Sequence, residues 1–389
     1  MFLLQLTLVD GHIGKNWARQ STIVRFSVLA ISVAAIWFGL LGEALVNTTI
    51  FDQVRGGTAD WLVTVEAATG SDSYAPVSDL ARDHLGWLDV GPNSAHPRPP
   101  SAVLLLIPLA LIPSRLIIIA LMTLSAGALV VWVQSSIRWM RAGVGYEWLA
   151  IPFAVTAPLL QGVVWGTHMP LVAAAIGASM LASGHKRGAW RGFFVGIASG
   201  LKVFPFGAAL AYKERRWVTV MTAVATVLGL SLVGLLLPGL SFESSLAALF
   251  DAADTYGNSI INMSVSYHIG GGLPVALLIA VLGLVLIFFT SNRTDPWVAV
   301  PTTLIITVLV SPLAWPEYLV LTFPGLLVLA LSGKRALLSA FLIWLVMVWS
   351  TDGTTLMLAA MAIALALALP EVRVWTEKNR TEELISSGP

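Results

Sequence analysis

Apolar runs long enough to cross a bilayer follow one another along most of the chain, where one crossing takes about 20 apolar residues. The first run, residues 26–45, follows Lys15, Arg19 and Arg25 and is too long for the core of a signal peptide. We therefore expect a retained first helix. Further spans are predicted at residues 218–237, 275–290, 298–310, 319–331, 337–349 and 356–369.

The middle of the chain contains runs that are short or interrupted by proline and glycine, at residues 101–112, 150–160 and 193–210. The last run lies between two basic segments, and lysine and arginine concentrate on the cytoplasmic side of short loops. We therefore expect residues 193–210 to enter and return on the same side, turning near Lys202 and Pro205. Broken helices at membrane depth are tolerated where they are buried in protein or line a wet cavity, so these breaks indicate a site.

The same charge rule places both ends of the chain in the cytoplasm, because basic clusters flank the first and last runs. The polar segments at residues 47–100, 238–272 and 311–318 then face outward.

Composition agrees with a membrane protein: 57% of residues are hydrophobic and 11% are charged, with a mean hydropathy of +0.83. The net charge of +1 offers no basic face for nucleic acid. The chain has no cysteine, which excludes disulfides and thiolate sites. No phosphate-binding glycine loop, zinc-protease helix or calcium loop occurs. We expect no nucleotide cofactor and name no metal ligands, and any metal requirement stays open.

In the first outer segment, Asp60 opens the stretch Asp60–Ala68, in which Trp61, Leu62 and Val63 are expected on the lipid interface as a juxtamembrane helix. Two interpretations of Asp60 are open. It caps the helix, since a carboxylate there satisfies free backbone N–H groups, or it acts as a base. Spacing alone favours the cap.

Lys202 stands between apolar residues, where a lysine costs about 2.5 to 3.5 kcal/mol unless it is paired or hydrated. It either snorkels from a helix end or binds an anionic phosphate. Arg98, with His96 beside it, precedes an apolar run and has the same snorkelling alternative. His168 is either a polar plug between two short runs or a site residue.

Two other outer segments carry polar and aromatic candidates. Asn262 and His268 lie in the second, where the polar side chains suit sugar hydroxyls and equally suit any exposed loop. Trp315 and Glu317 lie in the third, in a turn where Trp315 also fits the aromatic belt of a membrane protein.

These segments, in this order, resemble the polytopic GT-C glycosyltransferases, and most closely glycosyltransferase family 87, the polyprenyl-phosphate-mannose-dependent alpha-mannosyltransferases. The similar motifs run from residue 47 to residue 318 and are, in order, Asp60 to Val63 with Gly70 and Tyr74, Pro99-Pro100, Pro108 to Pro113, Gly196 to Lys202 with Pro205, Asn262-Met263-Ser264, and Ser311-Pro312 with Trp315. The family carries histidine just after this tryptophan, where the chain has Pro316-Glu317-Tyr318, and tyrosine in place of Arg98. Glu317, or a histidine from another loop, would take the missing role.

The resemblance implies an all-α, GT-C-like bundle of about 10–12 transmembrane or re-entrant helices. Residues 1–375 would form one domain, with an extracytoplasmic loop with juxtamembrane helices at residues 46–100, and residues 376–389 a cytoplasmic tail. The resemblance further implies an inverting transfer of a hexose, with mannose the first expectation, from a polyprenyl-phosphate sugar to a lipid or glycan acceptor. This transfer would occur on the extracytoplasmic side of the plasma membrane.

In that transfer Asp60 would be the general base, and Lys202 with Arg98 would bind the donor phosphate. Supporting or sugar-binding roles are implied for the remaining candidates, which are His96, Tyr74, His168, Asn262, His268, Trp315 and Glu317. Two other functions stay open. Broken helices also build transporters or lipid flippases, although we see no inverted repeat. The missing histidine is compatible with a non-catalytic scaffold of the same fold.

Overall fold

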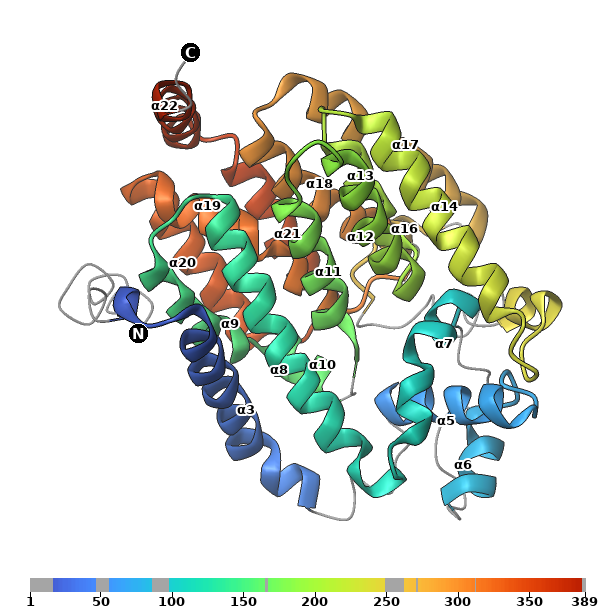
Figure 1. Ribbon diagram of the computed structural model, residues 1–389. Coiled ribbons are helices and arrows are strands. Elements are labelled where there is room, and N and C mark those ends of the chain that lie inside the picture. Colours follow the sequence, from blue (N-terminus) through green and yellow to red (C-terminus); the bar gives the residue numbers. More distant parts are fainter. Residues whose placement is uncertain are drawn as a thin grey trace.

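The computed structural model describes residues 17–46, 56–85, 98–164, 167–248, 262–270, 272–311 and 313–386. Its elements are helices (Figure 1). In chain order they are α3 (Thr22–Val46), α5 (Gly56–Thr69), α6 (Val77–Leu85), α7 (Pro100–Leu106), η1 (Ile107–Leu111), α8 (Ser114–Trp139), η2 (Val144–Leu149), α9 (Ala150–Ala154), α10 (Ala157–Val164), α11 (Met169–Leu181), α12 (Arg187–Leu201), η3 (Phe204–Gly207), α13 (Ala208–Ala211), α14 (Arg216–Gly234), α16 (Val265–Ile269), α17 (Gly272–Arg293), α18 (Pro296–Val310), η4 (Pro316–Thr322), α19 (Phe323–Ser332), α20 (Lys334–Trp349), α21 (Gly353–Ala366) and α22 (Pro370–Ser386).

The described helices include four that are long and apolar enough to span a membrane: Thr22–Leu41, Ile119–Trp139, Arg216–Gly234 and Pro274–Arg293. The pair α21 and α22, bent by 57°, is a further candidate. The prediction of an all-α polytopic membrane protein is confirmed. Most predicted spans match a helix of the structure, but sequence reasoning did not single out α8.

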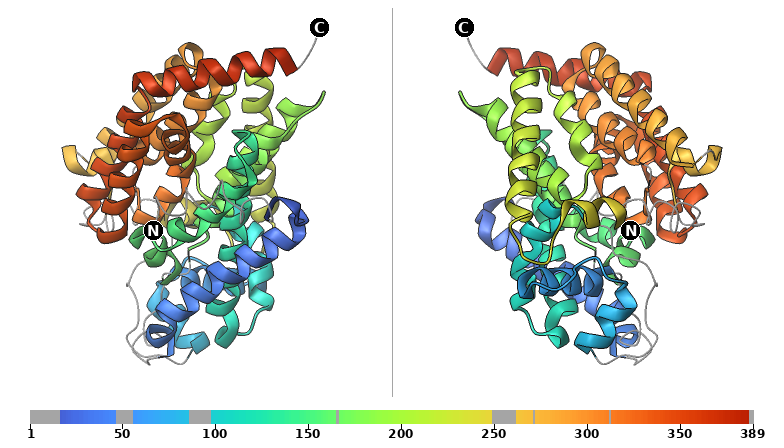
Figure 2. Two further views of the ribbon diagram at one scale, coloured as in Figure 1. Left: turned by 90° about the vertical axis from the view of Figure 1, so that its left-hand side faces the viewer. Right: turned by 90° about the vertical axis from the view of Figure 1, so that its right-hand side faces the viewer.

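Basic segments that lie far apart in the sequence meet at one end of the molecule. Lys213 Nζ donates to the carbonyl of Thr294 at 2.8 Å, and Arg335 Nε lies 4.0 Å from Glu371 Oε1 of α22. Figure 2 shows α22 across this end, with α5 and α6 at the opposite end. The helix α22 also runs through residue 376, where the cytoplasmic tail was expected to begin.

The segment predicted to be re-entrant enters and returns at the same end. The helix α12 stops at Leu201, the chain turns through η3, and α13 leads back to a basic segment. Arg187 Nη2 at the start of α12 lies 2.8 Å from Glu214 Oε2 after α13. This ion pair joins the two ends of the hairpin, so the predicted turn near Lys202 and Pro205 is confirmed.

Small residues allow α12 to lie against α14. A methyl group added at Gly192 would collide with the backbone carbonyl of Thr219, and one added at Gly196 would lie 2.5 Å from Thr226 Cβ. Glycines spaced four apart let helix backbones approach closely in membranes. The contact holds the re-entrant hairpin against a long, apolar helix.

The outer segment folds back on the protein. Trp61, Leu62 and Val63 of α5 are buried, and Trp61 Nε1 donates to the carbonyl of Ile112 at 2.9 Å. The expectation that these side chains lie on the lipid interface is therefore wrong, because they pack against α7 and η1 instead. Gly70 ends α5 with a φ of +89°, a left-handed conformation that glycine adopts readily.

Candidate active site

Lys202 lies at the tip of the re-entrant hairpin. The helix α12 ends there because the backbone becomes extended, with φ −147° and ψ 120°. The Lys202 Nζ atom lies 5.4 Å from the centre of the Tyr318 ring. The Phe204 ring stacks on the same tyrosine ring, with 4.5 Å between their centroids. An ammonium over an aromatic face is stabilised electrostatically. The hairpin tip and η4 therefore hold the lysine between them.

Glu317 is the second residue of the helix η4 and precedes Tyr318. It is 2% exposed, and Lys202 and Arg98 both interact with it electrostatically. The predicted candidates Lys202, Arg98 and Glu317, from three distant segments of the chain, therefore share one charged cluster. Burial opposes the charged form of this carboxyl, and the two cations favour it.

The helix α10 leaves room for the glutamate. A methyl group at Gly162 would lie 2.7 Å from Glu317 Cβ and 3.1 Å from Thr167 Oγ1. Both Glu317 Oε2 and Thr167 Oγ1 are buried without a hydrogen-bond partner among the residues that the structure describes. Buried polar atoms without a hydrogen-bond partner are unusual in proteins, so Glu317 and Thr167, which both lie against Gly162, are candidates for a site.

Arg98 is positioned by the outer segment. Tyr74 Oη donates to the Arg98 carbonyl at 2.6 Å and accepts from Ser245 Oγ at 2.8 Å. Burial raises the pKa of Tyr74 above its usual value, so the phenol stays protonated near neutral pH and donates. Tyr74 therefore connects the residues before α7 to the segment after α14.

The start of α7 is joined to the end of α12. Ser101 Oγ donates to the carbonyl of Gly200 at 2.9 Å, two residues before Lys202. His168 is 1% exposed, and its Nε2 lies 3.4 Å from the Leu201 carbonyl. The histidine therefore also contacts the helix end that presents the lysine.

Asn262 organises the turn that leads to Trp315. Its Oδ1 accepts from the backbone N–H groups of Ser264, at 3.0 Å, and Ala314, at 3.1 Å. The N–H of Met263 donates to the Ala314 carbonyl at 2.7 Å. Asn262 is fully buried, so its role here is to hold two backbone segments together. Two motifs of the resemblance thus meet in one hydrogen-bonded pair of segments.

The remaining predicted residues are placed differently. Trp315 directly precedes η4 and is half-buried, whereas His268 at the end of α16 is exposed and interacts electrostatically with Asp352. His268 therefore lies near the start of α21, away from Lys202 and η4. His96 lies outside the described residues.

Asp60 lies within α5, which begins at Gly56. The interpretation of Asp60 as a helix cap is therefore wrong, because a cap residue precedes the first turn. Its side chain lies outside the described part of the chain. Further along α5, Val63 and Ala67 are buried with Tyr74 and Val103.

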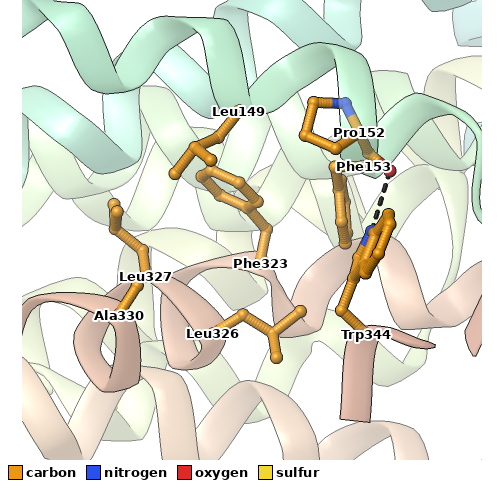
Figure 3. A pocket seen from close by; sticks show the side chains of 8 residues that line it. All are labelled: Leu149, Pro152, Phe153, Phe323, Leu326, Leu327, Ala330 and Trp344. Carbon is orange, nitrogen blue, oxygen red and sulfur yellow. Dashed lines mark hydrogen bonds between the residues drawn. The ribbon is translucent and has the colours of Figure 1, made fainter. Parts of the chain in front are cut away.

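An apolar pocket lies elsewhere, between η2 and α9 on one side and α19 and α20 on the other (Figure 3). Phe153 and Phe323 lie 5.0 Å apart between centroids, and Trp344 Nε1 donates to the Pro152 carbonyl at 2.9 Å. No charged side chain lines it, so this pocket does not suit a phosphate. Across the described residues, no cluster of histidine, aspartate and glutamate could hold a metal ion.

Sequence reasoning missed several residues around the charged cluster of Lys202, Arg98 and Glu317. Ser101, Ser245 and Phe204 carried no motif signal, and Gly162 was an ordinary small residue in an apolar run. Thr167, Phe204 and Ser101 stand next to residues that did carry a signal, which are His168, Pro205 and Pro100.

The fold and the charged cluster define a helical, multi-pass membrane protein with a cationic site at the tip of a broken helix. Residues 98–316 match glycosyltransferase family 87, and the chain belongs to this family. It is therefore a membrane glycosyltransferase. The matched range includes Arg98, His168 and Lys202, whereas Asp60 and Tyr74 precede it and Glu317 directly follows it. No curated protein matches the chain.

Proposed function

We propose that the protein transfers a hexose, mannose in the first instance, from a polyprenyl-phosphate sugar to a lipid or glycan acceptor on the extracytoplasmic side of the plasma membrane. The single observation that carries the donor assignment is that Lys202 and Arg98, from separate segments, both interact electrostatically with one buried glutamate. Two cations from separate segments suit a phosphate, which accepts charge-assisted hydrogen bonds from both. The family supports sugar transfer.

The reaction is an inverting displacement. The acceptor oxygen forms a bond to the anomeric carbon while the bond from that carbon to the phosphate oxygen breaks. Asp60 takes the proton of the acceptor hydroxyl as general base. The polyprenyl phosphate leaves with the bonding electrons, and Lys202 and Arg98 stabilise its charge. Energy is already present in the phosphoester, so no nucleotide site is needed at this step.

Orientation follows from charge. The segments predicted to be cytoplasmic share the α22 end, so the hairpin enters from the cytoplasmic side and its tip, with Lys202, approaches the outer segments. Donor and acceptor lipids would both reach the tip from within the bilayer. Tyr74, His168, Asn262 and Trp315 would then support the site from the surrounding segments, and the N- and C-termini would be cytoplasmic.

The test uses the full chain in proteoliposomes with radiolabelled polyprenyl-phosphate mannose and extracted membrane lipids as acceptors. We expect label in a new, larger lipid or glycan product. Polyprenyl-phosphate glucose and arabinose serve as competing donors. Transfer from only one of these other donors would show that the transferred sugar is not mannose. Movement of label across the bilayer without transfer would indicate a flippase. The absence of both transfer and movement would indicate a non-catalytic scaffold.

Asp60→Asn is expected to abolish transfer, because an amide cannot accept the acceptor proton. The variant should keep wild-type expression and wild-type binding of the donor. Asp79→Asn is the matched control in the same outer segment, since exposed Asp79 pairs with Arg82 on α6 and has no role in the proton transfer. An active Asp60→Asn enzyme would remove Asp60 from the role of base.

A further inference from the structure

The chain that follows α14 exposes large apolar side chains. Leu236 is 80% exposed and Phe242 is 70% exposed, and Leu246 is exposed as well. Residues 242–248 are helical where the structure describes them, so Phe242 and Leu246, four positions apart, lie on one face of this helix. Exposed apolar patches of this kind mark contacts with a partner or with a membrane.

The inner face of the same helix contacts the protein through a polar side chain. Ser245 Oγ donates to Tyr74 Oη at 2.8 Å, and Ala248 is buried in the small core that also contains Tyr74 and Val103. A helix at the surface of a water-soluble protein has the opposite arrangement, with its apolar stripe toward the core. A helix that turns serine inward and phenylalanine and leucine outward is suited to contact with lipid.

Close backbone packing fixes the segment on its inner side. A methyl group added at Gly239 would collide with the Ser71 carbonyl, and the N–H of Ser73 donates to the Gly239 carbonyl at 3.2 Å. A methyl group added at Gly234 would likewise collide with the Pro100 carbonyl. The chain after α14 is therefore held against the end of α5 and the start of α7, and its apolar side points away from both.

This apolar patch continues the exposed face of a helix that is long and apolar enough to span the membrane. Leu228 and Leu232 in the last turns of α14 are exposed, and the patch begins directly beyond them at Leu236. Within the patch, Ser241 and Glu243 are exposed too. Such mixed polarity next to the end of a span suits the headgroup layer, in which amphipathic helices insert their apolar side chains. The occupant that this continuity indicates is the bilayer itself.

We propose that residues 236–246 form an interfacial anchor, which lies in the headgroup layer of the leaflet beside α5 and α7 and sets the depth of Arg98 in the membrane. The connection is a pair of hydrogen bonds, since Ser245 donates to Tyr74 Oη and Tyr74 Oη donates to the Arg98 carbonyl at 2.6 Å. Arg98 is thereby held near the level of lipid phosphates. The role of this depth in binding the sugar donor rests on the proposed function, whereas the anchor itself does not.

The first experiment measures depth with nitroxide labels on single cysteines, because the chain has no cysteine of its own. Phe242→Cys and Leu246→Cys are labelled in the full-length protein and reconstituted in phosphatidylcholine vesicles. Oxygen, which concentrates in the bilayer, should relax both labels more strongly than a water-soluble nickel complex does. Leu228→Cys on the exposed face of α14 is the lipid reference, and Ser183→Cys, exposed after α11, is the aqueous control.

Three other outcomes would overturn the anchor. Stronger relaxation by the nickel complex at both positions would place the patch in water. Spin–spin coupling between labels on different molecules would show that a second copy of the chain covers the patch. Low access to both reagents without such coupling would show that other parts of the same chain cover it.

The second experiment tests the depth of Arg98 through sugar transfer in proteoliposomes. Phe242→Asp should raise KM for the long-chain polyprenyl-phosphate sugar about tenfold, because interfacial binding scales with buried apolar area, and Phe242→Leu should stay near wild type. Trp349→Asp is the matched control, since Trp349 is exposed at the end of α20 far from the basic segment at Lys334.

The two experiments fail in different ways. An unchanged KM in Phe242→Asp, with both labels in the bilayer, would show that the anchor does not set the depth of Arg98. If the wild type transfers sugar from no lipid-phosphate donor, the proposed function fails, and the label measurements still decide whether residues 236–246 lie in the headgroup layer.

Discussion

At the scale of single residues, the most informative side chain is the lysine at the end of α12. A lysine among apolar residues needs compensation. Here the Tyr318 ring, on which Phe204 stacks, lies 5.4 Å from the ammonium, and Glu317 interacts with it electrostatically. None of these partners lies on α12 itself. The lysine is therefore placed by the meeting of the hairpin with η4, not by its own helix.

Replacement of Lys202 tests this placement. Lys202→Met should lower kcat/KM for the lipid-linked donor on the order of 10²-fold, the typical cost of removing one group that stabilises developing charge. Lys202→Arg keeps a cation but changes its shape, and should retain part of the activity. The measurement is initial-rate transfer in proteoliposomes. Lys334→Met, at an exposed position at the start of α20, is the control, and equal activities of Lys202→Met and this control would contradict the role.

Residue-level signals also show what the sequence could and could not reveal. Lys202 was identifiable because a charge among apolar residues is costly. Gly162 was not identifiable from the sequence, because it matters only through the space it leaves for Glu317. That space is visible only in the packing of α10 on η4. The start of α5 was misplaced because Gly56 and Gly57 are weak helix formers. There the burial of Trp61 outweighs intrinsic propensity.

At the scale of elements, hydropathy and charge predicted the re-entrant hairpin, and the ion pair between Arg187 and Glu214 closes it. The partners of the hairpin were beyond prediction. Its contacts with α14 depend on glycines meeting Thr219 and Thr226, and its tip contacts α7 through Ser101. Such pairings join segments that no local pattern relates.

The packing of α12 on α14 should control the site from a distance. Gly192→Ala places a methyl group against the Thr219 carbonyl, and overpacking of this kind typically costs about 1–3 kcal/mol. We expect a lower melting temperature in detergent and reduced transfer, because the hairpin that presents Lys202 must shift. Gly229→Ala on α14 has open space around the new methyl group and should be neutral or slightly stabilising. Equal melting temperatures for both variants would contradict the packing argument.

At the scale of the whole molecule, one large core joins most of the described helices, and a smaller one lies between α5 and α7. Residues from α3, α8, α11, α18, α19 and α21 belong to a single buried cluster, whereas α14 and α17 present many exposed apolar side chains. Exposed leucine and valine on long apolar helices suit contact with lipid tails. The basic segments lie toward the α22 end, whereas the tip of the hairpin contacts α7, which packs against α5.

Orientation in the membrane can be measured directly because the chain has no cysteine. Ser241, after α14, and Ser183, after α11, are both exposed. In intact cells, a membrane-impermeant maleimide should label Ser241→Cys and should label Ser183→Cys only after the membrane is permeabilised, because basic loops stay in the cytoplasm. The converse labelling would place the outer segments, with Tyr74 and Arg98, in the cytoplasm. Sugar transfer would then have to use donor lipids of the inner leaflet, so this single pair of variants decides on which side of the bilayer the enzyme acts.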